Sequence, residues 1–275
     1  MIAANPETSM RKPAPPPRPW SNTRILGHVL MAIWIVAGMS LLYYLGTNVA
    51  SPFVQKYFPK YVSGFLVTLQ IVGLSLVIGA LLSIPIAIAR GSKWKIFSRP
   101  AYAYVYFFRG TPLLAQTFLI YYGAGTFRSE LEAIGLWGFF REAYFCVIFA
   151  FSLNTSAYQA EILRGAILNV PRGQWEGAAA LGLSKPVTFF KVILPQALMV
   201  ALRPYGNEII LMVKSSAIAA IVTIYDLMGE TRRAYSRSYD FQAYIWAAVA
   251  YLVIVEALRR VWDKIELRLT RHLKR

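Results

Sequence analysis

Residues 161–206 read EILRGAILNVPRGQWEGAAALGLSKPVTFFKVILPQALMVALRPYG, a polar, proline-punctuated stretch between two apolar runs. We call this stretch the elbow. Residues 170–173, Val-Pro-Arg-Gly, have the composition of a turn, and residues 174–181 after them predict a short helix. Glu176 falls in the first turn of that predicted helix, where a carboxylate interacts favourably with the positive end of the helix dipole.

Gly182 is expected to end this short helix, because glycine adopts a positive φ at little steric cost. Ser184, followed by Lys185-Pro186, predicts the cap of a second helix that runs towards Pro195. The stretch therefore predicts a helix-turn-helix outside a lipid bilayer. Taken alone, it is also compatible with an ordinary interfacial hairpin between two spans.

The composition excludes an ordinary soluble domain. Of the 275 residues, 57% are hydrophobic and 15% are charged, and the mean hydropathy is +0.46, which indicates a polytopic membrane protein. The formal net charge is +16, but basic and aromatic residues are not gathered on one soluble module, so no nucleic-acid partner is predicted. One cysteine, Cys146, and two isolated histidines, His28 and His272, indicate neither a disulfide framework nor a metal site.

Apolar runs long enough to cross the roughly 30 Å hydrocarbon core recur along the chain. The predicted fold class is all-α, a transmembrane helical bundle of about six spans, at residues 25–46, 64–89, 101–123, 142–160, 196–224 and 243–261. Residues 1–24 are basic and proline-rich and predict a disordered tail. The first run is longer than the roughly 7 to 15 apolar residues of a signal peptide, so we expect an uncleaved span.

The third predicted span is interrupted in its interior. Residues 107–116 read FFRGTPLLAQ, in which a charge, a glycine and a proline together break the apolar pattern. Such a break is tolerated at membrane depth only where the freed backbone is buried in protein or lines water. This helix is therefore expected to face the bundle.

Lys and Arg are concentrated on one side of the predicted spans. Counting spans places residues 1–24, the loop at 90–100, the elbow and the C-terminal tail on the same side, and these segments hold most of the basic residues. By the positive-inside rule this side is the cytoplasm. Both termini are expected there, whereas the loops at 124–141 and 225–241 on the other side carry matched charges.

The elbow resembles the cytoplasmic EAA loop of permease subunits of ATP-binding-cassette (ABC) importers. The matching segments are Glu176-Gly177-Ala178, Gly182 and Val192-Ile193-Leu194-Pro195. Gly177 replaces the usual first alanine and Val192 the usual isoleucine, and both substitutions keep small or apolar character. The resemblance implies an ATPase-coupling surface that includes Glu176, Gly177, Ala178, Gly182, Leu194 and Pro195.

Further segments resemble the polar-amino-acid permeases within that family, over roughly residue 61 to the end. They are FRGTPLLAQ at 108–116, AYQAEILRGAI at 157–167 and NEIILMVKSS at 207–216. The chain looks most like the M-type subunit of histidine, lysine, arginine, ornithine and octopine uptake systems. The resemblance divides the chain into an extra N-terminal helix at 25–46, a permease core at 61–265 and a basic tail at 266–275.

This resemblance implies a type I ABC importer permease in the bacterial inner membrane, with no cofactor of its own. The implied partners are two ATP-binding subunits, a homologous permease or a second copy of this chain, a periplasmic binding protein, an amino acid substrate and membrane lipid. ATP hydrolysis would belong to the separate subunits. The amino acid, the identity of the second permease and the role of the extra helix are left open.

Ionisable residues within the fifth span need partners or water, because a charge deep in hydrocarbon costs several kcal/mol. Glu208 and Lys214 are six residues apart and do not share one clean helical face, so a mutual ion pair is not expected. They either line a polar cavity for a zwitterionic substrate or pair with Arg109 or Arg203 to fix helices or the dimer interface. The candidate substrate-path residues are Asn207, Glu208, Lys214, Ser216, Gln116 and Asn154.

Two other classes of protein compete with a transport subunit. A passive channel or ion-coupled carrier would explain buried charges but not a glycine-hinged elbow of this spacing. An intramembrane enzyme would need a nucleophile with a base, a Walker A sequence or a metal set, and the sequence contains none that is recognisable.

Overall fold

The computed structural model describes residues 20–271, and every regular element within them is helical. The chain forms two compact units, residues 1–55 and 56–275. The first unit contains α1 (Asn22–Asn48), whose N-cap residue Ser21 accepts a hydrogen bond at 3.3 Å from the backbone N–H of Arg24. The predicted tail lies largely outside the described residues. Its last part, residues 22–24, is helical, so the span predicted from residue 25 begins earlier.

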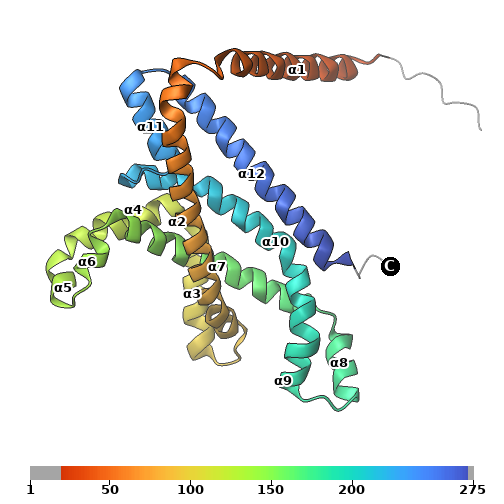
Figure 1. The fold of residues 1–275 in the computed structure, drawn as a ribbon. Helices are drawn as coiled ribbons and strands as arrows, with labels where there is room; N and C mark the ends of the chain where they lie inside the picture. The colour runs from red at the N-terminus through yellow and green to blue at the C-terminus, as the bar shows by residue number, and fades with distance from the viewer. Residues whose placement is uncertain (1–19, 272–275) are drawn as a thin grey trace, which may run out of the picture. The chain divides into compact units, whose positions relative to one another are not determined.

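Helix α2 begins in the first unit and leads into the second, whose described regular elements are all helical (Figure 1). The elements are α2 (Pro52–Gly91), α3 (Lys95–Gly110), α4 (Leu113–Thr126), α5 (Arg128–Ala133), α6 (Trp137–Phe140), α7 (Ala143–Leu168), α8 (Arg172–Ala180), α9 (Lys185–Thr188), the π-helical η1 (Phe189–Ile193), α10 (Leu194–Ser215), the 3-10 segment η2 (Ser216–Val222), α11 (Leu227–Ser238) and α12 (Gln242–Leu269).

Helix α7 is the central element of the second unit. It packs against α3, α4 and α10, and α10 packs in turn against α12. The fully buried Phe151 of α7 lies in a hydrophobic core with Ile71 and Val72 of α2 and with Met212 and Val213 of α10. The core therefore ties α2, α7 and α10 together.

Three segments that were predicted as loops from their polar composition contain helices. Residues 48–60 contain the start of α2, which begins at Pro52, a position that suits proline because the first helical N–H has no partner. Residues 225–241 contain α11, whose N-cap Asp226 accepts a hydrogen bond at 2.8 Å from the backbone N–H of Gly229. Residues 124–141 contain α5 and α6.

The interruption predicted in the third span is confirmed, but it separates two helices instead of kinking one. Helix α3 ends at Gly110 and α4 starts at Leu113, with Thr111 and Pro112 in extended backbone between them. Proline cannot donate a backbone hydrogen bond, so the break falls where a continuous helix would lack one of its backbone hydrogen bonds. Helix α12 also extends to Leu269 and includes the first residues of the predicted tail at 266–275.

The predicted elbow is present as a helical hairpin, drawn at the end of the second unit opposite α11 (Figure 1). Gly182 has φ +72°, as predicted, and a Cβ built there meets no atom within 4 Å. Ser184 lies at the N-cap of α9, although its side chain makes no capping hydrogen bond. Glu176 is misplaced in the prediction: α8 begins at Arg172, so Glu176 lies beyond the first turn and gains little from the helix dipole.

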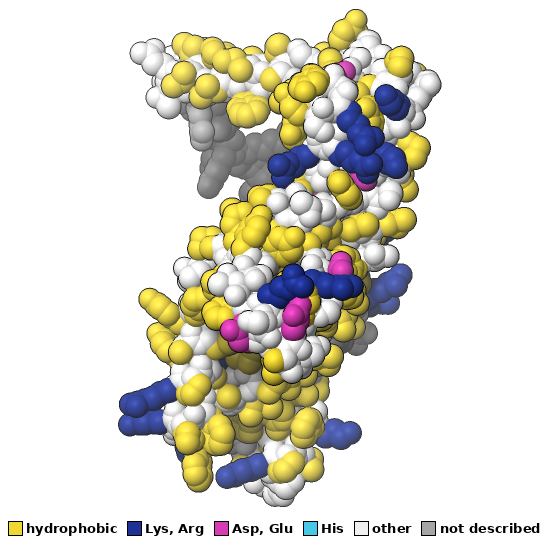
Figure 2. Space-filling view, turned by 90° about the vertical axis from the view of Figure 1, so that its left-hand side faces the viewer, with side chains coloured by type: hydrophobic (Ala, Val, Ile, Leu, Met, Phe, Trp, Pro, Cys, Tyr) yellow, Lys and Arg dark blue, Asp and Glu magenta, His cyan; other side chains and the backbone are white. Residues whose placement is uncertain are grey.

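The described surface fits a lipid environment. Three helical runs are long and apolar enough to cross a membrane, at Asn22–Asn48, Pro52–Gly91 and Lys185–Val222. Figure 2 shows hydrophobic side chains over much of the visible face, interrupted by separate groups of Lys and Arg. The other predicted spans fall on α3 with α4, α7 and α12, and the total of about six stays a prediction.

Candidate functional site

The break between α3 and α4 is held by two amide side chains that the sequence analysis singled out. Gln116 donates to the backbone oxygens of Phe108 at 2.9 Å and Thr111 at 3.0 Å. Asn154 of α7 donates to the same Phe108 oxygen at 3.0 Å and to the side-chain oxygen of Gln116 at 3.0 Å. These amides replace the helical partners lost at Pro112, which gives both residues a structural role.

Glu208 of α10 is buried and ends a chain of hydrogen bonds between α10 and α7. Its carboxylate accepts from Thr155 at 2.8 Å, and the Thr155 hydroxyl accepts from Gln159 at 3.0 Å. Tyr205, one turn before Glu208, donates to the Gln159 side-chain oxygen at 2.6 Å. Gly79 of α2 makes this possible, because a Cβ there would collide with the Thr155 methyl group.

A polar cavity of about 300 Å³ lies where these two networks meet. Asn154 and Glu208 line it from α7 and α10, together with Thr111, Pro112, Leu113, Tyr158, Leu211, Met212 and Ser215. The Thr155 bond engages one carboxylate oxygen of Glu208, and the carboxylate has further acceptor capacity. The cavity therefore combines a charged acceptor with apolar walls, an arrangement suited to the ammonium group of a small zwitterion.

The remaining candidates do not join this cavity. Asn207 and Lys214 are exposed on the isolated chain, and the buried Ser216 donates to the backbone oxygen of Val213 at 2.8 Å. Neither arginine considered as a partner forms an ion pair with Glu208 in the described chain. Arg203 pairs with Glu266 at 3.0 Å, and the Arg109 guanidinium lies over the Tyr158 ring.

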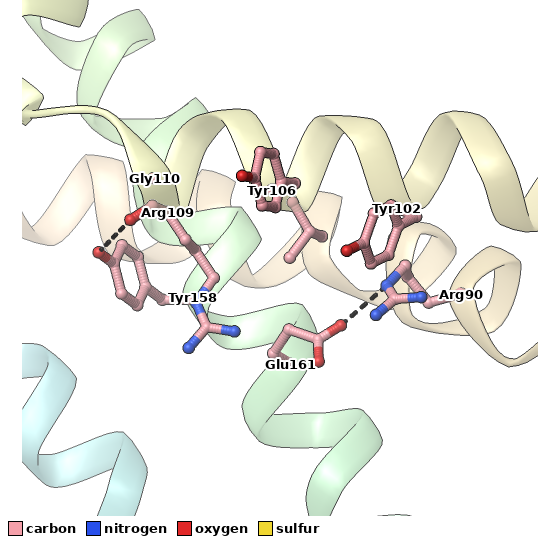
Figure 3. A pocket seen from close by; sticks show the side chains of 8 residues that line it. Arg90, Tyr102, Tyr106, Arg109, Gly110, Tyr158 and Glu161 are labelled. Atoms are coloured by element: carbon pink, nitrogen blue, oxygen red, sulfur yellow. Dashed lines mark hydrogen bonds and ion pairs between the residues drawn. The ribbon is translucent and has the colours of Figure 1, made fainter.

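A second hollow of about 350 Å³ adjoins the first at Tyr158, which lines both. Figure 3 shows the guanidinium groups of Arg90 and Arg109 flanking the carboxyl group of Glu161. Arg90 donates to Glu161 at 2.9 Å and Arg164 pairs with it at 2.7 Å. Burial alone would raise the pKa of Glu161, but the two arginines outweigh it and hold that pKa below its usual value.

The elbow is anchored at its base and exposed at its tip. Ile193 and Ala197 pack with Ala166 and Val170 in a small separate core. Of the predicted coupling residues, Ala178 is buried, Leu194 is half-buried, and Glu176, Gly177, Gly182 and Pro195 are exposed. Five large apolar side chains within residues 172–193 are also exposed, namely Trp175, Leu181, Leu183, Val187 and Phe190. Exposed apolar side chains of this kind mark a protein–protein or a membrane interaction site.

Sequence reasoning did not single out three residues that complete the site. Gln159 and Tyr205 connect Glu208 to α7, and Tyr158 separates the two hollows. Gln159 follows Thr155 by four residues, so the two share one helical face. The four-residue spacing is the one local signal that could have linked Gln159 to Thr155. Their contacts with Tyr205 and Glu208 of α10 depend on packing between segments that are distant in the sequence.

The bundle with its polar cavity and exposed elbow defines a helical membrane permease. Residues 79–271 match the family described as binding-protein-dependent transport system inner membrane component. The chain belongs to this family.

Two curated relatives are similar over most of both chains. The nopaline transport system permease protein NocM of Agrobacterium fabrum (strain C58 / ATCC 33970) is 42% identical over 218 residues, 79% of this chain and 90% of the relative. The histidine/lysine/arginine/ornithine transport system permease protein HisM of Escherichia coli (strain K12) is 39% identical over 213 residues, 77% of this chain and 90% of the relative.

Solved structures agree with this fold. A chain from the crystal structure of an amino acid ABC transporter with histidines gives a TM-score of 0.71 at 35% identity, over 78% of this chain and 96% of that one. A chain from the inward-facing MetNI methionine ABC transporter gives a TM-score of 0.59 at 19% identity, over 79% of this chain and 96% of that one. The second likeness concerns the fold alone.

Proposed function

We propose that this chain is the permease subunit of an ATP-driven importer for polar, in particular basic, amino acids or related opines. It receives substrate from an extracytoplasmic binding protein and releases it into the cytoplasm of a bacterium. ATP is hydrolysed by two separate subunits that dock on the elbow, and a second permease, either a copy or a homologue, completes the pathway. The nopaline and histidine/lysine/arginine/ornithine systems of the relatives support this substrate class.

One observation carries the proposal: the exposed elbow continues into the helix that bears Glu208. The run from Lys185 to Val222 is helical throughout, so α9, η1 and α10 connect the elbow to the polar cavity without a loop. A displacement of the elbow would therefore reach the cavity through one helical run. An ion-coupled carrier, the competing class, has no use for such a connection to a soluble partner.

Uptake into vesicles tests this function. The permease complex is reconstituted with ATP inside, the binding protein outside, and labelled arginine, histidine or nopaline as the probe. We expect uptake that requires internal ATP and persists when an ionophore dissipates ion gradients. Uptake that does not require ATP and is abolished by the ionophore would establish a carrier instead. ATP hydrolysis by the purified chain alone would contradict separate ATPase subunits.

The proposed orientation makes a prediction of its own. Both termini should be cytoplasmic, because the basic segments of the chain gather on that side. Cysteines introduced at Ser9 and at His272 are expected to react with a membrane-impermeant thiol reagent only in inside-out vesicles. Cys146 is the single cysteine of the sequence, so replacing it by alanine gives a background free of native thiols. Labelling of the two sites from opposite faces would remove either the first span or the side assignment.

A further inference from the structure

The segment that forms α11 contains equal numbers of acidic and basic residues, but its exposed side chains are mainly basic. Residues 225–241 contain three acidic and three basic residues. The acidic side chains of Asp226 and Glu230 are only 0% and 6% exposed, and Asp226 caps α11. Arg232 and Arg237 are exposed, and the Arg233 side chain is 34% exposed. The third acidic residue, Asp240, is half-buried, and its carboxylate accepts a hydrogen bond at 2.9 Å from the backbone N–H of Gln242. The surface of the folded segment therefore carries an excess of positive charge, although the segment is neutral in sequence.

Two of these arginines line a concave site. A pocket of about 340 Å³ lies between the end of η2 and α11, walled by Ile221, Ile224 and Gly229 and lined by Tyr225, Arg232, Arg233 and Ser236. Arg232 donates to the backbone oxygen of Ala220 at 3.1 Å. Arg233 lies over the Tyr225 ring and reaches Glu230 at 3.5 Å. These contacts hold both guanidinium groups at the pocket and leave other N–H donors of each group available. We call this the outer arginine pocket.

The location of the pocket sets it apart from the basic segments near the elbow. Helix α11 lies at the end of the second unit away from the elbow (Figure 1), and one of the separate groups of Lys and Arg side chains in Figure 2 lies at the height at which Figure 1 draws α11. In the proposed orientation this end is extracytoplasmic. The positive-inside rule does not account for exposed arginines there, so they need another explanation.

We propose that the outer arginine pocket is the docking site for an acidic side chain of the extracytoplasmic binding protein. Paired guanidinium groups favour carboxylates, because each presents two parallel N–H donors to the two carboxylate oxygens. A charged contact of this kind accelerates and orients a partner that must bind and leave in every cycle. The inference rests on the proposed function, since it requires this end of the bundle to face outwards and a binding protein to dock there.

The test measures ATP hydrolysis by the complete complex in lipid nanodiscs against the concentration of substrate-loaded binding protein. Replacing both Arg232 and Arg233 by Gln should raise the half-saturating concentration about tenfold, which corresponds to about 1.4 kcal/mol, with little change in the maximal rate. The wild-type value should rise with salt, and the variant value should rise less. Arg128→Gln is the matched control, because this exposed arginine of α5 pairs with Glu132 outside the pocket.

A second variant guards against a folding defect, because Arg232 also binds the backbone of η2. Arg237→Glu changes an exposed residue in the last turn of α11 and should raise the half-saturating concentration as well, by repulsion. Wild-type half-saturation in both variants, with normal stimulation of the wild type, overturns the inference alone. Two other outcomes also overturn the inference. In the first, the increase in half-saturating concentration disappears in nanodiscs without anionic lipid. In the second, the variants dissociate the permease pair. If the wild type shows no stimulation, the proposed function fails as well.

Discussion

A Glu208→Gln variant is expected to assemble normally and to lose uptake by about tenfold or more. The amide is nearly the same size as the carboxylate and can still accept the 2.8 Å hydrogen bond from Thr155, so the contact between α7 and α10 survives. The negative charge facing the polar cavity does not survive, and hydrogen bonds to charged groups are roughly twice as strong as neutral ones. The loss of about 1.4 kcal/mol in substrate binding corresponds to that tenfold decrease.

Assembly and uptake must be measured on the same preparation. Glu266→Gln is the matched control, because Glu266 pairs with Arg203 between α10 and α12 and lines none of the described hollows around Glu208. We expect the control to transport at close to the wild-type rate. Loss of complex formation in Glu208→Gln would instead mean that the carboxylate holds helices together.

The second large effect is expected at the elbow, where Gly182→Val should insert normally and yet abolish coupling. With φ +72° at this position, a branched side chain is strained by on the order of 1 kcal/mol or more. The backbone relieves that strain by changing the direction in which α9 leaves the turn. Nothing lies within 4 Å of the added Cβ, so the effect arises from the backbone and not from a collision.

The measurements are membrane content, binding-protein-stimulated ATP hydrolysis and uptake, and the last two should fall together. Gly182→Asn is the matched control, since asparagine tolerates the left-handed conformation and should retain most coupling. Glu176→Lys should also uncouple transport, by reversing an exposed charge on the predicted docking surface. If either disruptive variant is made at normal levels and couples as the wild type does, that residue is not part of the transmission surface.

Much of the fold could be predicted because apolar runs and special residues act locally. Gly182, Pro112 and the apolar runs each determine a turn, a break or a helix from their own neighbourhood. The helices within predicted loops were missed because the polar composition of these segments was read as loop. For α11, the N-cap Asp226 is a local signal that could have indicated the helix. The hydropathy of a segment indicates whether the segment lies in water or in an apolar environment. It does not indicate the backbone conformation.

The candidate site was harder to predict, since it depends on contacts between distant segments. The sequence suggested Gln116, Asn154 and Glu208 together, but only packing shows that the two amides bond the α3–α4 break while Glu208 faces the cavity. One of the two alternatives for Glu208 paired it with Arg109 or Arg203, whereas the observed hydrogen-bond partner is the hydroxyl of Thr155. A hydrogen bond from a neighbouring helix thus satisfies one oxygen of the Glu208 carboxyl group and leaves the other available.

The exposed apolar side chains of the elbow favour a long-lived contact with the subunit that is proposed to dock there. Leu181 is 80% exposed, and with Phe190 and Val187 it offers a contact driven by burial of apolar area, which salt does not weaken and cooling does. Such a contact dissociates slowly once it is closely packed, whereas a guanidinium–carboxylate contact at the other end forms and breaks quickly. The chain thus has the physical means to keep a resident subunit on one face while exchanging a visiting one on the other.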